Sequence, residues 1–272
     1  MSRCLGYFLK NETRKVTVLV ATSGDTGGAV ANGFYDVEGI EVVILYPKNR
    51  VSPVQEKQLT ALGKNIHALE VNGSFDDCQA LVKQAFSDES LTEKLLLTSA
   101  NSINVARWLP QQIYYVLALK QWLKIHSENP VICVPSGNFG NICAGILAHH
   151  RGLPVEHFIA ACNVNDVVPE YLRTEILQPK ETVATISNAM DVGDPSNFAR
   201  VLSLYDNSHA AITADISGAT YTDEQIRETV GEVYRETGYL LDPHGACGYR
   251  ALSEGLFPCE TGIFLETAHP AK

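Results

Sequence analysis

The chain has 272 residues, of which 45% are hydrophobic, and its formal net charge is −10. This length is enough for two domains of ordinary size, each with its own core. The chain carries 31 acidic residues against 21 basic ones and has no block of Lys and Arg, which excludes the usual electrostatic profile of a nucleic-acid-binding protein.

The apolar segments are short. None approaches the ~20 residues that a membrane-spanning helix needs, and the start "MSRCLGYFLKNETRK" is too charged for a secretory signal. We therefore expect a soluble, cytoplasmic protein without membrane partners. The seven cysteines are scattered and never spaced as C-x-x-C, so we expect reduced thiols and no metal site.

The first third of the chain alternates between two patterns. Apolar runs typical of buried strands occupy 16–21, 41–47 and 66–71, and each precedes a segment with helical character, at 27–35, 52–63 and 74–86. This order predicts parallel strands joined by crossover helices that cover both faces of a sheet. A long helical stretch is then expected over 96–125.

The pattern returns in the second part of the chain, with strands expected at 131–135, 157–163 and 262–267. Thr222 with Gln225 three residues later is typical of a helix N-cap, and Gly238 suits the end of the same helix. The sequence thus predicts an α/β fold with two parallel-sheet domains, a small one at 1–100 and a large one at 101–272. Ligands prefer the carboxyl ends of such strands, so we expect the active site in the cleft between the domains.

Two polar loops with glycines directly follow apolar strands. They are "TSGDTG" at 22–27 and "SGNFGN" at 136–141. Backbone N–H groups at a strand-to-helix turn bind anions, and glycine lets the backbone approach closely, so the second loop suits a phosphate monoester. Neither loop has the glycine spacing of nucleotide-binding motifs. Glycine at such a turn also occurs for purely structural reasons, and that alternative stays open for each loop alone.

A third polar cluster, "TSANSINVAR" at 98–107, ends in Arg107, whose guanidinium could hold a phosphate or carboxylate with two hydrogen bonds. His244 and His269 are candidate acid or base groups, although histidines are equally common in cores and turns. Asp191 and Asn197 either line the cleft or belong to an ordinary turn.

Six segments in series, "ATSGDTGGAV", "SANSINVARWLPQ", "VPSGNFGNICAG", "SNAMDVGDPSNFARV", "DPHGACGYRAL" and "ETAHPAK", resemble the threonine synthases of bacteria and fungi. These are pyridoxal-phosphate enzymes of the tryptophan-synthase-β fold type (fold type II), and the similarity follows the family's order along nearly the whole chain. It implies that the chain uses pyridoxal 5'-phosphate to convert O-phosphohomoserine and water to threonine and phosphate.

The resemblance also implies roles for individual residues. The cofactor phosphate would lie in the loop Ser136, Gly137, Asn138, Phe139, Gly140 and Asn141, with Asp25 beside the cofactor ring and Thr267 near its nitrogen. The substrate carboxylate would lie against Ser23, Gly24 and Thr26, and the substrate phosphate against Asn101, Ser102 and Arg107.

The family's lysine that bonds covalently to the cofactor would fall just before Met1, and the family continues after "AHPAK". We therefore expect a chain shortened at both ends, with no catalytic residue that can be assigned within it. Two alternatives to an active threonine synthase follow: a catalytically silent phosphate-binding remnant, and, less favoured, a serine or threonine dehydratase of the same fold. The phosphate cluster at 101–107 opposes the dehydratase.

Overall fold

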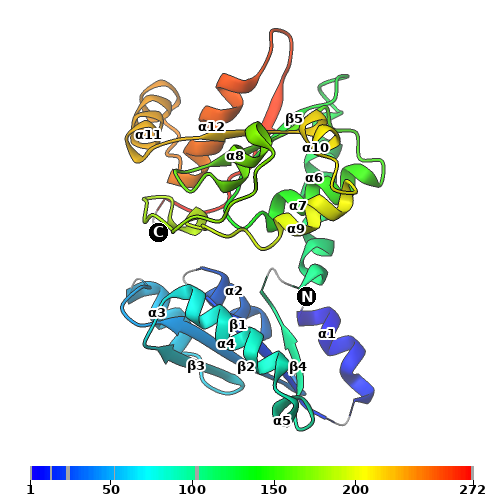
Figure 1. Ribbon diagram of the computed structural model, residues 1–272, viewed down its shortest axis with the longest axis vertical. Helices are drawn as coiled ribbons and strands as arrows, with labels where there is room; N and C mark the ends of the chain where they lie inside the picture. The colour runs from blue at the N-terminus through cyan, green and yellow to red at the C-terminus, as the bar shows by residue number, and fades with distance from the viewer. Residues whose placement is uncertain (1, 13, 23–24, 52, 102–103, 271–272) are drawn as a thin grey trace. The chain divides into compact units, whose positions relative to one another are not determined.

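The computed structural model describes residues 1–272 except 1, 13, 23–24, 52, 102–103 and 271–272. The chain divides into two compact units, Met1–Arg107 and Trp108–Lys272. This division falls a few residues after residue 100, where the sequence suggested a boundary. Each unit contains one four-stranded parallel sheet with helices on its faces (Figure 1).

The first unit contains the sheet β3-β2-β1-β4. In chain order its elements are α1 (Ser2–Phe8), η1 (Leu9–Asn11), β1 (Val16–Ala21), α2 (Asp25–Phe34), β2 (Ile40–Pro47), α3 (Pro53–Thr60), β3 (Ile66–Val71), α4 (Phe75–Ser87), α5 (Glu89–Thr92), β4 (Leu96–Ser99) and η2 (Val105–Arg107). Every residue of β1 is buried, as expected for an interior strand of a parallel sheet. Side chains of β1 and β2 pack with α2 and α3 on one face, while Leu19 and Ala21 pack with α4 on the other.

The second unit contains the sheet β7-β6-β5-β8. Its elements are α6 (Trp108–Trp122), β5 (Val131–Pro135), α7 (Gly140–His150), β6 (His157–Cys162), α8 (Val167–Thr174), η3 (Asn188–Met190), α9 (Phe198–Leu204), α10 (His209–Asp215), β7 (Ile216–Thr220), α11 (Asp223–Thr237), α12 (Pro243–Gly255) and β8 (Gly262–Phe264). Helices α6 and α7 pack on one face of β5 and β6, and α11 and α12 pack on the other.

The helix ends follow local rules that the sequence already displays. Thr222 and Gln225 form the predicted capping box of α11, and Gly238 ends that helix with a left-handed φ of 74°. Asp242 caps α12 by accepting the backbone N–H groups of His244 and Gly245.

Three expectations were wrong. The stretch 96–125 is not one helix, because it begins with β4, which pairs with β1 from Leu96 onward, and α6 starts only at Trp108. No strand was expected at β7, and the strand expected at 262–267 ends at Phe264 as the half-buried edge strand β8. These strands are short, and they are held by pairing with distant strands that local patterns cannot reveal.

Candidate phosphate-binding site

In the second unit, parallel pairing gathers the carboxyl ends of three strands at one edge of the sheet. Cys133 of β5 is in register with Ile159 of β6 on one side and with Phe264 of β8 on the other. The segments that leave this edge are the loop 136–141 after β5, Asn163 after β6 and Thr267 beyond β8. The sheet therefore brings together segments that lie more than a hundred residues apart in the chain.

The loop 136–141 turns directly into α7, which begins at Gly140. Phe139, the residue before the helix, has a φ of 62° and a ψ of 13°, a left-handed conformation that a bulky side chain rarely adopts. Such backbone conformations persist only where the surroundings enforce them, and they concentrate at binding sites. The turn leads into the first N–H groups of α7, at the positive end of the helix dipole, so it has the properties of an anion site.

Residues 196–198 hold this loop in place. The Ser196 hydroxyl donates to Oδ1 of Asn138 at 3.0 Å, and the Asn197 amide donates to the Asn138 carbonyl at 2.9 Å. The ring of Phe139 packs edge-to-face on that of Phe198, with centroids 5.7 Å apart, and both rings are buried. This support explains how Phe139 can remain in a left-handed conformation.

Two polar side chains of the loop are occupied within the protein. The Ser136 hydroxyl donates to the Val134 carbonyl at 2.8 Å. The Asn141 amide donates to the Pro135 carbonyl at 3.2 Å, and its oxygen accepts the N–H of Ile142 at 2.8 Å. These contacts shape the loop, so an anion there would rely mainly on backbone N–H groups.

Thr267 and its neighbour Glu266 are exposed beyond β8. The Asp242 N–H donates to Oε1 of Glu266 at 3.4 Å. Partial burial raises the pKa of Glu266 to about 7, and the negative charge of Asp242 adds to this rise. Burial opposes ionisation of Asp242 as well, but hydrogen bonds from the side chain and backbone of His244 leave the pKa of Asp242 below its usual value.

The buried polar cluster around Asn163 was not predicted. Asn163 is fully buried, and its amide donates to Thr185, Ser187 and Asp191. Asp191, which the sequence suggested as a cleft or turn residue, lies within this cluster, where burial raises its pKa despite the hydrogen bonds that it accepts. The sequence analysis placed Asn163 inside the strand expected at 157–163, whereas β6 ends at Cys162, and a polar residue at the carboxyl end of an apolar run is the signal that could have found it.

In the first unit, the loop after β1 is closed by Thr22. Its hydroxyl accepts the N–H of Gly27 at 2.9 Å, and a side chain at position 27 would collide with Thr22. Thr26 is half-buried in the first turn of α2. The predicted residues Ser23 and Gly24 lie outside the described residues, as does the side chain of Asp25.

The loops after β1 and β4 are joined by Asn101. Its amide donates to the Ala21 carbonyl at 2.6 Å, and its oxygen accepts the Ala21 N–H at 2.8 Å. The structure thus places Asn101 beside Ala21, the last residue of β1. Both ends of its side-chain amide are occupied by this contact.

Arg107 ends the first unit and is half-buried. One of its guanidinium nitrogens donates to the Ala100 carbonyl at 3.0 Å. Burial lowers the pKa of Arg107 from its ordinary value, and no carboxylate among the described side chains forms an ion pair with it. A half-buried guanidinium with no counter-ion in the described protein is suited to bind an anion. The predicted neighbour Ser102 lies outside the described residues.

The lysines that the structure describes are all exposed. Several form surface ion pairs, such as Lys15 with Glu41 at 2.7 Å and Lys180 with Asp166 at 2.6 Å. No described lysine comes directly after the loop 136–141, and none belongs to the hydrophobic core clusters of the second unit. These are the properties of solvated surface lysines.

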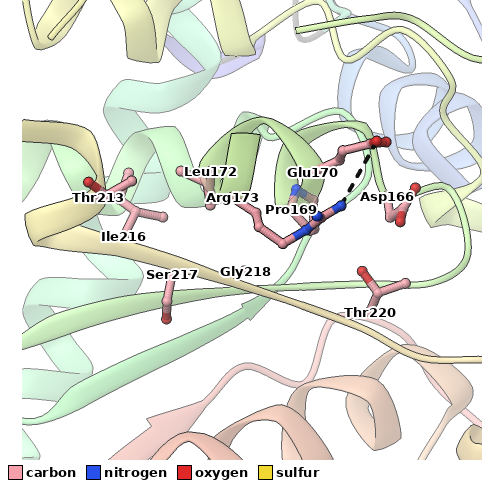
Figure 2. A pocket seen from close by; sticks show the side chains of 10 residues that line it. All are labelled: Asp166, Pro169, Glu170, Leu172, Arg173, Thr213, Ile216, Ser217, Gly218 and Thr220. Atoms are coloured by element: carbon pink, nitrogen blue, oxygen red, sulfur yellow. Dashed lines mark ion pairs between the residues drawn. The ribbon is translucent and has the colours of Figure 1, made fainter. Parts of the chain in front are cut away.

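A separate cavity of about 430 Å³ lies between α8 and β7. Figure 2 shows Glu170 and Arg173 of α8 beside it, with a 4.0 Å ion pair between them. None of the residues predicted for the site lines this cavity, so it is unrelated to the phosphate loop.

The described residues contain no cluster of His, Cys, Asp or Glu arranged to hold a metal ion. Five cysteines are buried, Cys4 and Cys259 are exposed, and all seven are free thiols. Within the described part of the chain, no helix has both the length and the apolar character to cross a membrane.

Each of the two units is an α/β unit built on a parallel sheet, and the second has a strand-to-helix loop with the properties of an anion site, so the fold defines the chain as an α/β protein. The chain belongs to the family of pyridoxal-phosphate dependent enzymes, which it matches over residues 1–260. This result confirms the family resemblance seen in the sequence.

Individual relatives agree with this assignment. The threonine synthase of Haemophilus influenzae is 50% identical over 258 residues, which are 95% of this chain and 60% of that protein. A crystal structure of Escherichia coli threonine synthase matches with 48% identity and a TM-score of 0.89, covering 99% of this chain and 63% of that one. The PLP-bound threonine synthase of Brucella melitensis matches with 36% identity and a TM-score of 0.90, over 99% and 63% of the two chains. The chain thus spans about three fifths of the length of these relatives.

Proposed function

We propose that this chain binds pyridoxal 5'-phosphate through the loop 136–141 and serves the threonine synthase reaction, in which O-phosphohomoserine and water give threonine and phosphate. The observation that carries the cofactor assignment is the enforced left-handed Phe139 at the start of α7. It turns the loop into the N-terminus of a helix, where a phosphate monoester is held without a basic side chain. The PLP-bound Brucella relative supports the same assignment.

When bound, pyridoxal phosphate supplies a ring that withdraws electrons from the substrate carbons near its amino group. The protein's task is to hold, orient and shield the reactants. We assign Thr267 to the ring nitrogen, where a neutral hydroxyl stabilises a proton less than a carboxylate would. Asp25 is assigned to the side of the ring, and Ser23, Gly24 and Thr26 to the substrate carboxylate.

We assign the substrate phosphate to Arg107, with Ser102 beside it. The support for this assignment is the half-buried guanidinium of Arg107, which no described carboxylate neutralises. Asn101 already makes two hydrogen bonds with Ala21, so its proposed part is to hold the loop that carries Ser102 and Arg107. A dehydratase substrate has no phosphate for this arginine to bind, which opposes that alternative.

The composition favours a small-molecule substrate over nucleic acid, and we propose that the protein acts in the cytoplasm. A second candidate function is a chain that binds the cofactor but does not turn substrate over. The specific observation in its favour is that every described lysine is exposed, because a lysine that bonds the cofactor aldehyde must lie at the cofactor.

The test is titration of the purified chain with pyridoxal phosphate, followed by borohydride reduction and peptide mapping. One modified lysine at one equivalent, together with release of threonine and phosphate from O-phosphohomoserine, supports the active enzyme. Tight binding with no fixed lysine supports the silent alternative, since loss of a positioned proton-transfer group typically lowers the rate ~10²–10⁴-fold. Equal affinity for pyridoxal phosphate and pyridoxal would overturn the cofactor assignment itself.

A further inference from the structure

The short turn η3 lies directly against the phosphate loop. An added Cβ at Gly137 would lie 2.6 Å from the Met190 Cα atom and 2.9 Å from the Ala189 carbonyl oxygen. Such distances leave no room for a side chain, so the backbones of the loop and of η3 are in contact. Met190 is buried, and any shift of η3 would therefore be transmitted to Gly137.

The turn η3 is held on one side by His244, at the start of α12. Nδ1 of His244 lies 2.7 Å from Oδ1 of Asp242, and the Ala189 N–H donates to Nε2 of His244 at 3.2 Å. Because a backbone N–H can only donate, Nε2 must be the acceptor, and the Nδ1 proton then points to Asp242. The imidazole is buried, so this arrangement fixes both its tautomer and its orientation.

On its other side η3 is held by Asn163. The Asn163 amide donates to the Ser187 hydroxyl at 3.2 Å, and the Ser187 carbonyl in turn accepts the N–H of Met190 at 2.9 Å. Both Asn163 and Ser187 are fully buried. The turn is thus fixed from the carboxyl end of β6 and from the N-terminus of α12, and neither contact involves the loop itself.

We propose that His244 is a positioning residue for the phosphate-binding loop, acting through the Ala189 N–H and η3 on Gly137. This inference rests on the proposed function for its cofactor readout. His244 touches no reacting group in this role. It supplies a hydrogen-bond acceptor at one defined position, and without that acceptor η3 can move away from Gly137.

The test compares His244→Phe, which removes both hydrogen bonds, with His244→Gln, whose carbonyl oxygen can still accept the Ala189 N–H. His157→Phe is the matched control, since His157 is also hydrogen-bonded, at 2.9 Å to Ser217. Affinities for pyridoxal phosphate and for pyridoxal are measured, together with amide hydrogen exchange of residues 136–141 and 187–191. His244→Asn, which keeps a donor toward Asp242 but is too short to reach Ala189, replaces His244→Phe if that variant does not fold.

We expect His244→Phe to lose affinity for pyridoxal phosphate by about tenfold, the usual scale for one unsatisfied buried donor, with pyridoxal unaffected. Exchange at 136–141 should accelerate, whereas His244→Gln and His157→Phe stay within about twofold of wild type at these residues. Unchanged exchange in His244→Phe, or an equal loss for both ligands, would overturn the inference. If wild type binds both ligands equally, the proposed function fails, while the exchange data still decide whether His244 orders the loop.

Discussion

The side chain of Asn101 makes two hydrogen bonds with the backbone of Ala21, at 2.6 and 2.8 Å, and so joins segments that lie 80 residues apart. Strands β1 and β4 are paired only up to Leu19 and Ser99. Beyond that point Asn101 takes the place of the missing strand pair, offering one donor and one acceptor as a backbone residue would. The loop that leads to Arg107 is thereby tied to the loop that leads to α2.

Asn101→Ala should destabilise this edge of the first unit by about 1–3 kcal/mol, because it leaves both polar groups of Ala21 without partners. The measurement is amide hydrogen exchange of peptides from β1 at increasing urea concentrations. In the variant, β1 should lose its protection at a lower urea concentration than in wild type. The matched control is Asn32→Ala, an exposed residue of α2 whose substitution removes one hydrogen bond, to the Gly28 carbonyl, and increases helix propensity. Equal β1 exchange in the two variants would contradict a structural role for Asn101.

Two glycine substitutions should have opposite signs. Gly137→Ala places a methyl group 2.6 Å from the Met190 Cα atom. We therefore expect this variant to lose about 1–3 kcal/mol in free energy of unfolding and to bind pyridoxal phosphate more weakly. Gly231→Ala lies within α11, where no atom lies within 4 Å of the added Cβ, and should stabilise by about 0.5–1 kcal/mol. Thermal unfolding distinguishes these outcomes, and a stable Gly137→Ala variant would mean that η3 moves away from the loop freely.

The sequence alone predicted features that depend on neighbouring residues. The strand-to-helix turn at 136–141 is marked by an apolar run, glycines and a following helix, and the cap of α11 is marked by Thr222 and Gln225. Contacts across long stretches of chain could not be predicted in this way. Ser196 is bonded to Asn138 58 residues away, and β4 is defined by its pairing with β1. Such contacts depend on how the sheets assemble, which short-range periodicity does not specify.

Arg107→Ala should weaken binding of O-phosphohomoserine about 10–100-fold, the scale of a charge-assisted hydrogen bond to phosphate, and should leave homoserine unaffected. The lysine substitution should restore only part of this affinity, because an ammonium group cannot form the two-pronged contact. Arg173→Ala is the control, since Arg173 is an exposed arginine on α8. Calorimetric titration provides the measurement, and equal losses in both alanine variants would place the phosphate elsewhere.

Glu266→Gln should make stability less sensitive to pH. Because burial raises the folded pKa of Glu266 to about 7, above its ordinary value of 4.5, the folded protein retains this proton longer than the unfolded chain does. The contribution of Glu266 to the free energy of unfolding is therefore fully present below the pKa of the unfolded chain. This contribution declines as the pH rises from about 4.5 to about 7.

Glutamine keeps an oxygen that can accept the Asp242 N–H but never ionises, so the variant should match wild type at pH 4.5 and unfold at a higher temperature at pH 8. At pH 8 we expect the free energy of unfolding of the variant to exceed that of wild type by at most about 1 kcal/mol, because Glu266 is more than a third exposed and water screens its charge. Glu260→Gln is the control, a carboxylate beyond α12 that accepts the N–H of Phe257. A gain at pH 8 that persists unchanged at pH 4.5 would show that the effect comes from packing and not from the protonation of Glu266.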